Sequence, residues 1–151
     1  NYAVDDNEQP VFYKKIVETV VHEFCHSFTR IKGDTGKALE KSGKALQEYT
    51  YSSMRRQAYG TWRNILEESL VRAATICYLI DHDYDEKDIR KAIIEQVDRN
   101  FFWMPELVQT LRYYESHRKK YPTFTSFYPE IVRFFDRYVA DREKEMQKVM
   151  E

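Results

Sequence analysis

The chain has 151 residues, which is enough for one domain with a hydrophobic core and does not require a second. Its 24 basic and 25 acidic residues nearly cancel, so we expect neither nucleic acid nor an anionic membrane surface as a partner. A high aromatic content with only four glycines and four prolines favours a packed, mainly α protein over a disordered chain or an all-β fold. We therefore expect a single domain over residues 1–151.

The cysteines and the apolar stretches argue against a disulfide-stabilised protein and against a membrane-spanning one. Cys25 and Cys77 have no C-x-x-C spacing and are too few for a disulfide scaffold, so we expect two buried thiols. The longest nearly apolar stretch, SLVRAATICYLI, carries an arginine and is shorter than the roughly 20 residues that a membrane span needs. No membrane span is expected. Because the chain starts at Asn1 without a signal peptide, we expect it to be the C-terminal part of a longer precursor.

The first third of the chain predicts one helix with a strong apolar face. NYAVDDNEQP is rich in turn residues and could hold at most one short strand, whereas residues 11–30 predict a helix. At 100° per residue its apolar side chains gather on one face, which we expect to pack on the core. That face comprises Val17, Val20, Val21, Phe24 and Phe28. Gly33 and Gly36 interrupt the pattern, and the weakly amphipathic helix that follows to about Tyr59 is expected to be mobile and to face solvent.

Four more helices are predicted in the remaining sequence. Thr61 is a good N-cap for TWRNILEESLVRAATICYLI, which we expect to be buried. Asp85 caps EKDIRKAIIEQVD, and Pro105 suits the first turn of PELVQTLRYYESHRKK. YPTFTSFYP predicts a loop, within which Thr125 or Ser126 begins the last helix, whose charged tail we expect to be solvated.

The stretch VVHEFCHSF, residues 20–28, carries the pattern His-Glu-x-x-His. His22 and His26 are one helical turn apart, so both imidazoles can reach one metal ion, and Glu23 projects beside them toward a metal-bound water. The two histidines lie roughly opposite the apolar face of the same helix, which suits the wall of a cleft. We therefore predict a zinc site here in preference to two ordinary core or surface histidines.

A catalytic zinc ion takes three protein ligands and keeps a fourth position for water. The metzincin pattern would continue with glycine at position 29 and histidine at 32, but the chain has Thr29 and Lys32 there. The other two histidines of the chain lack the apolar flanks that are usual for a ligand. ILEESLVRA supplies Glu67 and Glu68 inside the most hydrophobic helix, where a carboxylate needs cationic compensation. Either glutamate could complete the site.

HEFCH followed by a glutamate on a second helix resembles the gluzincin metallopeptidases, in which His-Glu-x-x-His is completed by a downstream glutamate. VVHEFCHSF together with LEESLVRA is more closely similar to an uncharacterised bacterial family, a domain of unknown function found largely in exported proteins, that shares the gluzincin pattern. The resemblance covers about residues 11–135. It implies the helical half of a zincin-like metallopeptidase domain and an exported, periplasmic or cell-surface protein.

The resemblance also assigns roles to individual residues. Its register before Val-Arg-Ala implies that Glu68, and not Glu67, is the third zinc ligand. Glu23 is then the general base that takes a proton from the zinc-activated water and passes it to the leaving amine during peptide hydrolysis. Arg72 stands where thermolysin-like gluzincins carry an aspartate, so another acceptor must orient His22.

A second donor to the tetrahedral oxyanion is usually needed besides zinc. RYYESHR places Tyr113 and His117 one helical turn apart, and we take these two residues as the candidates. Packing is the competing explanation for any single tyrosine, because the chain contains twelve.

The main expectation is a zinc-dependent metallopeptidase that acts on a peptide or protein substrate. One alternative is a zinc-containing helical scaffold or interaction domain without turnover. It is favoured because NYAVDDNEQP cannot build the β-sheet with which gluzincins pair an extended substrate. The other alternative is a zinc hydrolase of a non-peptide amide, since a zinc-bound water and a base do not distinguish the two substrates.

Overall fold

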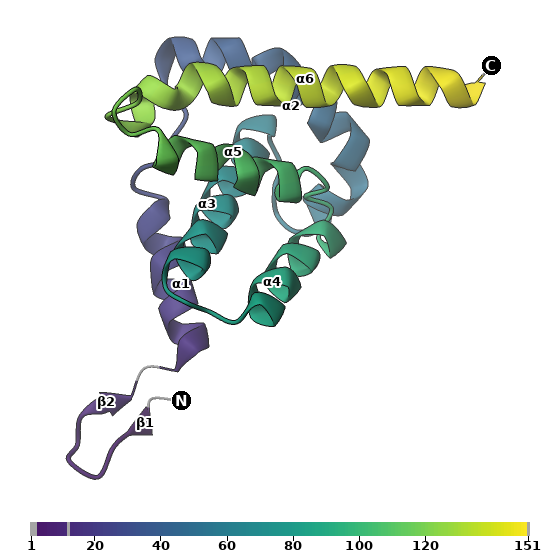
Figure 1. Ribbon diagram of the computed structural model, residues 1–151. Coiled ribbons are helices and arrows are strands. Elements are labelled where there is room, and N and C mark those ends of the chain that lie inside the picture. The colour runs from purple at the N-terminus through teal and green to yellow at the C-terminus, as the bar shows by residue number, and fades with distance from the viewer. Residues whose placement is uncertain (1–2, 12, 151) are drawn as a thin grey trace.

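The computed structural model describes residues 3–11 and 13–150, so both ends of the expected domain 1–151 lie outside the described residues. These residues form a β-hairpin followed by six helices (Figure 1). The elements in chain order are β1 (Ala3–Val4), β2 (Pro10–Val11), α1 (Lys14–Cys25), α2 (Gly33–Arg56), α3 (Trp62–Asp81), α4 (Glu86–Asp98), α5 (Met104–Ser116) and α6 (Phe124–Met150). The mainly α fold expected from composition is confirmed.

Helix α3 is the central element of the helical body. It packs against α1, α2, α4 and α5. Helix α6 contacts α2 and α5 and runs across the top of the molecule in Figure 1. Because α3 is covered on most sides, nearly every turn buries a side chain, and Ile65, Leu66 and Leu70 are fully buried. The helix begins where predicted, since the Thr61 hydroxyl accepts a hydrogen bond from the backbone N–H of Asn64.

Helix α2 corrects the expectation of a mobile, solvent-facing segment. It is one continuous helix of 24 residues that packs against both α3 and α6. Its buried residues alternate large apolar side chains with small ones: Gly36, Leu39, Ser42, Gly43, Leu46, Thr50 and Met54. Small residues lower the average hydropathy of the segment, yet they allow the neighbouring helices to approach closely. The hydropathy pattern therefore underestimated how much of this helix is buried.

The predicted core face of α1 is wrong. Val20, Phe24 and Phe28 are 58%, 65% and 59% exposed, and the other two valines of that face are only half-buried. Helix α1 packs on α3 through its opposite side, which carries His22 and His26. The physical reason is a buried carboxylate in α3, described below, that draws the histidines inward. The helix also ends at Cys25, short of the predicted residue 30.

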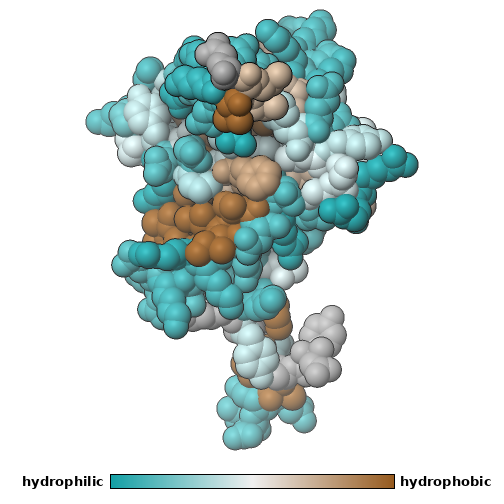
Figure 2. Space-filling view, turned by 90° about the vertical axis from the view of Figure 1, so that its right-hand side faces the viewer, coloured by the Kyte–Doolittle hydropathy of each residue, from teal (hydrophilic) through white to brown (hydrophobic). Residues whose placement is uncertain are grey.

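The N-terminal segment holds two short strands, one more than expected. The Asp5 carboxylate accepts hydrogen bonds from the backbone N–H groups of Asn7 and Gln9, both at 2.9 Å, and this closes a tight turn. Val4 is thereby paired with Pro10 in an antiparallel ladder. The hairpin projects below the helical body and is exposed along the side chains that the structure describes (Figure 2).

The predicted loop 121–129 is shorter than expected, because α6 begins at Phe124 and contains Pro129. Thr123 supplies the cap: its hydroxyl accepts from the N–H of Ser126 at 3.1 Å, and the Ser126 hydroxyl accepts from the N–H of Thr123 at 3.2 Å. This reciprocal pair is a capping box, which the sequence analysis did not use. The charged C-terminal end of α6 is exposed, as expected.

The contact between α2 and α3 gives a prediction about stability. A Cβ atom at Gly43 would lie 2.6 Å from Cε3 of Trp62 and 3.1 Å from Cδ1 of Leu66. We expect Gly43→Ala to lower the free energy of unfolding by about 1–3 kcal/mol through overpacking, although alanine is the better helix former. Gly60→Ala is the matched control, because a Cβ there would meet nothing within 4 Å. Urea denaturation followed by circular dichroism measures both, and a stabilised Gly43→Ala would contradict the packing.

Candidate metal centre

Helices α1 and α3 lie side by side and bring together the two histidines and Glu68 (Figure 1). The imidazoles of His22 and His26 follow one another along α1, with ring centroids 5.1 Å apart in an edge-to-face arrangement. His22 lies within the helix and His26 is its C-cap residue, with helical backbone angles. The side chain of His22 is 24% exposed and that of His26 is 41% exposed. Both rings therefore stand at an edge of the α1–α3 contact that solvent can reach.

The Glu68 carboxylate on α3 lies close to both histidines of α1. Its Oε1 atom is 3.5 Å from Nε2 of His22, and its Oε2 atom is 3.7 Å from Nε2 of His26. The residue is only 6% exposed, so its carboxylate is buried inside the α1–α3 contact. Three of the side chains singled out in the sequence thus converge on one point, each with a metal-binding atom aimed at the others.

Glu67, the other candidate for a third ligand, points elsewhere. Its Oε1 atom accepts a hydrogen bond of 2.8 Å from the backbone N–H of Ile31. Nη1 of Arg63 donates to the carbonyl oxygen of the same residue at 2.5 Å. Glu67 and Arg63 therefore hold the segment after α1 against α3, and of the two glutamates it is Glu68 that faces the histidines.

Glu23 lies on the solvent side of the histidine pair. The residue is exposed, and its carboxylate belongs with His22 and His26 to a group whose metal-binding atoms all lie within 4.8 Å of one another. A hollow of about 360 Å³ opens beside His26, between the segment after α1 and Glu67. Solvent can therefore reach Glu23, and the hollow gives access to His26.

Arg72 and Tyr59 complete the surroundings of Glu68. Nη2 of Arg72 is 2.7 Å from Oε1 of Glu68, and the Tyr59 hydroxyl donates to the same oxygen at 3.1 Å. Arg72 also donates to the Tyr59 hydroxyl at 2.9 Å and to Oε1 of Gln96 at 2.6 Å, and its guanidinium lies 5.1 Å from the centre of the Phe101 ring. Glu68 and Arg72, one helical turn apart on α3, therefore form a buried ion pair that is part of a larger network.

Sequence reasoning missed Tyr59 and Gln96 as members of this site. Tyr59 lies in the turn before α3 and Gln96 lies on α4, so no spacing within one helix connects either of them with Glu68. The acceptor that was expected to orient His22 is not found, because within residues 3–11 and 13–150 the polar contact of its ring is the one to Glu68.

Electrostatics favour the neutral form of His22. Burial lowers the pKa of His22, and the Arg72 cation and His26 act in the same direction, while Glu68 and Glu23 oppose them. Neutral imidazole is the form that binds a metal ion through a ring nitrogen. The site therefore presents a lone pair on His22 at neutral pH.

Tyr113 and His117 lie at the C-terminal end of α5. Their rings stack on each other with centroids 3.9 Å apart, and Nδ1 of His117 lies 2.9 Å from the carbonyl oxygen of Tyr113. Tyr113 also meets the ring of Tyr121, and it lines a hollow formed with α6. Among the described residues no contact joins this pair to His22, Glu23, His26 or Glu68. Their role as oxyanion donors stays a prediction.

Comparison with known proteins identifies the family. The family model described as "Domain of unknown function (DUF4932)" matches residues 4–134, most of the chain, and the chain belongs to this family. No curated protein and no solved structure matches the chain. Both the His-Glu-x-x-His stretch and Glu68 fall within the matched residues.

The described residues contain no helix that is long and apolar enough to cross a membrane.

The buried network around Glu68 gives a second prediction. Arg72→Met leaves the Glu68 carboxylate without its cation, and breaking a buried pair from one side costs about 3–5 kcal/mol. We therefore expect a loss of about 3 kcal/mol in the free energy of unfolding of the metal-free protein. Urea denaturation in the presence of a chelator measures it.

Two further variants test the cause of that loss. The double variant Arg72→Met, Glu68→Met buries no uncompensated charge and should recover most of the stability. Arg112→Met, which removes the more exposed pairs with Asp81 and Glu115, should cost less than about 1 kcal/mol. A double variant as unstable as Arg72→Met alone would show that lost packing, and not the stranded carboxylate, is the cause.

Proposed function

We propose that this protein is a zinc-dependent metallopeptidase of the gluzincin type. The observation that carries the proposal is the position of the Glu68 carboxylate, which lies 3.5 and 3.7 Å from the Nε2 atoms of His22 and His26. Zinc bonds of about 2.0–2.1 Å in tetrahedral geometry separate the donor atoms by about 3.3 Å. The Nε2 atom of each histidine lies close to that distance from one oxygen of the Glu68 carboxylate.

The chemistry of the donor set also fits zinc. Two imidazoles and one carboxylate form the ligand set of a catalytic zinc site that keeps a position open for water. The buried Glu68 needs cationic compensation, and Arg72 with Tyr59 is bonded to its Oε1 atom. Within the described residues Oε2 faces the Nε2 atom of His26, and it is the oxygen that we assign to the metal.

The residues of the chain then divide the work of hydrolysis. His22, His26 and Glu68 hold the ion, which when bound lowers the pKa of a water molecule and polarises a carbonyl group. Glu23 is exposed beside them and binds no metal in this scheme, so its carboxylate is free to take a proton from the attacking water. The same carboxyl group then delivers that proton to the leaving amine. The hollow beside His26 offers space for the substrate.

A zinc-containing interaction domain without turnover is the second candidate. It is supported by the exposed apolar face of α1, where Val20, Phe24 and Phe28 stand in solvent. Contiguous apolar surface on a soluble protein marks contact sites for other proteins. A zinc hydrolase of a non-peptide amide would use the same residues and differs only in substrate.

Metal binding is the first test of the proposal. We expect the folded protein to bind one zinc ion, Glu68→Gln to weaken binding by at least about tenfold, and Glu67→Gln to bind like the wild type. The glutamine substitutions keep side-chain size, and circular dichroism checks that each variant is folded. Elemental analysis gives the stoichiometry, and competition with a chromophoric chelator gives the affinity. No zinc in the wild-type protein would refute the site, and the reverse order of the two variants would move the third ligand to Glu67.

Peptide hydrolysis is the second test, and the effect of replacing Glu23 distinguishes an enzyme from an interaction domain without turnover. Glu23→Gln should keep the fold and the zinc while lowering peptide hydrolysis by about 10²- to 10⁴-fold, because the proton transfer is lost. Glu18→Gln is the matched control, since it removes a carboxylate from the same helix outside the His22, Glu23, His26 group. Digestion of a broad peptide library, read by mass spectrometry, measures cleavage with and without chelator.

The library digestion has two contrary outcomes. If Glu23→Gln cleaves peptides as well as the wild type does, the mechanism is refuted, because the general base must then be another group. A zinc-loaded wild type that cleaves no peptide in the library would favour the interaction domain.

A further inference from the structure

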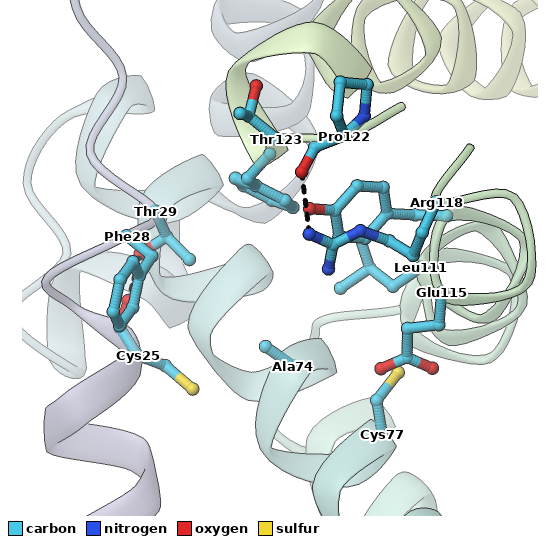
Figure 3. A pocket seen from close by; sticks show the side chains of 12 residues that line it. Cys25, Phe28, Thr29, Ala74, Cys77, Leu111, Glu115, Arg118, Pro122 and Thr123 are labelled. Carbon is cyan, nitrogen blue, oxygen red and sulfur yellow. Dashed lines mark hydrogen bonds between the residues drawn. The ribbon is translucent and has the colours of Figure 1, made fainter. Parts of the chain in front are cut away.

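A second pocket lies beside α1 and shares Thr29 with the hollow next to His26. It is a hollow of about 460 Å³ between the C-terminal end of α1, the middle of α3, the end of α5 and the start of α6 (Figure 3). Small-molecule sites in proteins commonly have volumes of about 300–1,000 Å³. None of the residues proposed to bind zinc, and not Glu23, lines this hollow.

The wall of the pocket is mainly apolar. It is formed chiefly by Phe28, Ala74, Leu111, Tyr114 and Phe124. Two thiols, Cys25 and Cys77, face the same space, and burial raises the pKa of both, so they stay protonated and apolar at neutral pH. A ligand that fills this space must therefore be largely apolar itself.

Two charged side chains also line the pocket, and their situations differ. Glu115 accepts a hydrogen bond of 2.6 Å from Nη1 of Arg112, which also pairs with Asp81. Arg118 has no carboxylate within ion-pair distance in the part of the chain that the structure describes. The wall therefore holds one carboxyl group and one guanidinium, and of the two it is Arg118 that has no ion-pair partner among the described residues.

Arg118 is held in place at the mouth of the pocket. Its Nη2 atom donates to the carbonyl oxygen of Pro122 at 2.8 Å, and its guanidinium lies 4.6 Å from the centre of the Tyr114 ring. Figure 3 shows the guanidinium directed toward Pro122, whereas Glu115 lies beside Cys77 at the other end. The remaining N–H donors of Arg118 are available, and a planar guanidinium binds a carboxylate through two parallel hydrogen bonds.

We propose that this pocket binds an apolar monocarboxylate, with the carboxylate on Arg118 and the hydrocarbon part against Phe28, Ala74 and Leu111. A single arginine matches a single negative charge, and the apolar wall matches a hydrocarbon chain or an aromatic ring. The site uses none of the residues of the proposed hydrolysis, so it exists whether or not the protein is a peptidase.

Decanoate is a suitable probe, with 1-decanol and decylamine as ligands that share its chain but not its charge. Isothermal titration of the full chain should give saturable binding of one decanoate, clearly weaker binding of 1-decanol and none of decylamine. Arg118→Gln should weaken decanoate about ten- to a hundredfold, because charge-assisted hydrogen bonds are lost. Lys119→Gln, the neighbouring exposed cation, should bind like the wild type.

Thiol chemistry gives an independent readout of occupancy. Cys25 is half-buried at the wall, so decanoate should slow its reaction with a disulfide reagent in the wild type but not in Arg118→Gln. Ala74→Leu, which fills the hollow, should abolish both binding and protection. Should that variant fail to fold, Arg118→Gln still decides, because it changes only the mouth. Equal affinity for decanoate and 1-decanol, unchanged binding in Arg118→Gln, or no protection of Cys25 would each overturn the proposal.

Discussion

The burial of the Glu68 carboxylate is the constraint on which the rest of the structure depends. An ionised carboxylate at 6% exposure costs several kcal/mol unless charges or hydrogen bonds offset it. Arg72 from the same helix, Tyr59 from the preceding turn and two histidines from α1 all approach it. Through Gln96, which accepts from Arg72, the same network reaches α4. One buried charge thus connects α1, α3, α4 and the turn before α3.

This constraint explains the orientation of α1. If hydrophobicity alone decided which face of α1 is buried, it would be the face with Phe24 and Phe28. Instead, α1 contacts α3 through the face that carries His22 and His26. Two imidazoles beside a buried carboxylate form a polar contact that an apolar face could not replace, because the carboxylate would then keep Arg72 and Tyr59 but lose both histidines. The hydrogen bonds of Glu67 and Arg63 to the backbone of Ile31 hold the segment after α1 against α3 and so support the same orientation.

Local signals in the sequence predicted the helices well and their environments poorly. Thr61 was identified as a cap because the cap bond involves residues only three apart in the chain. Tyr59 could not be found in this way, since its bond to Glu68 depends on the turn before α3 and carries no periodic signal. Tyr113 and His117 do meet each other, as a one-turn spacing requires, but that spacing says nothing about which neighbouring element they face. Helix α2 was misjudged because its buried face relies on Gly43 and Ser42, which hydropathy counts as solvent-facing.

A buried ion pair is weak evidence for stability, because well-packed apolar side chains of similar volume commonly stabilise a protein as well or better. Fold stability alone therefore does not explain why α3 carries Glu68 and Arg72 at its most covered positions, among Leu66, Leu70 and Ala73. The arrangement of the pair suggests a different reason. Arg72 and Tyr59 bind the Oε1 atom, while Oε2 is directed at His26 and lacks a comparably short bond. One oxygen of this carboxylate is thus fixed by Arg72 and Tyr59, and the other faces the imidazole of His26, which is the arrangement that the proposed metal site requires.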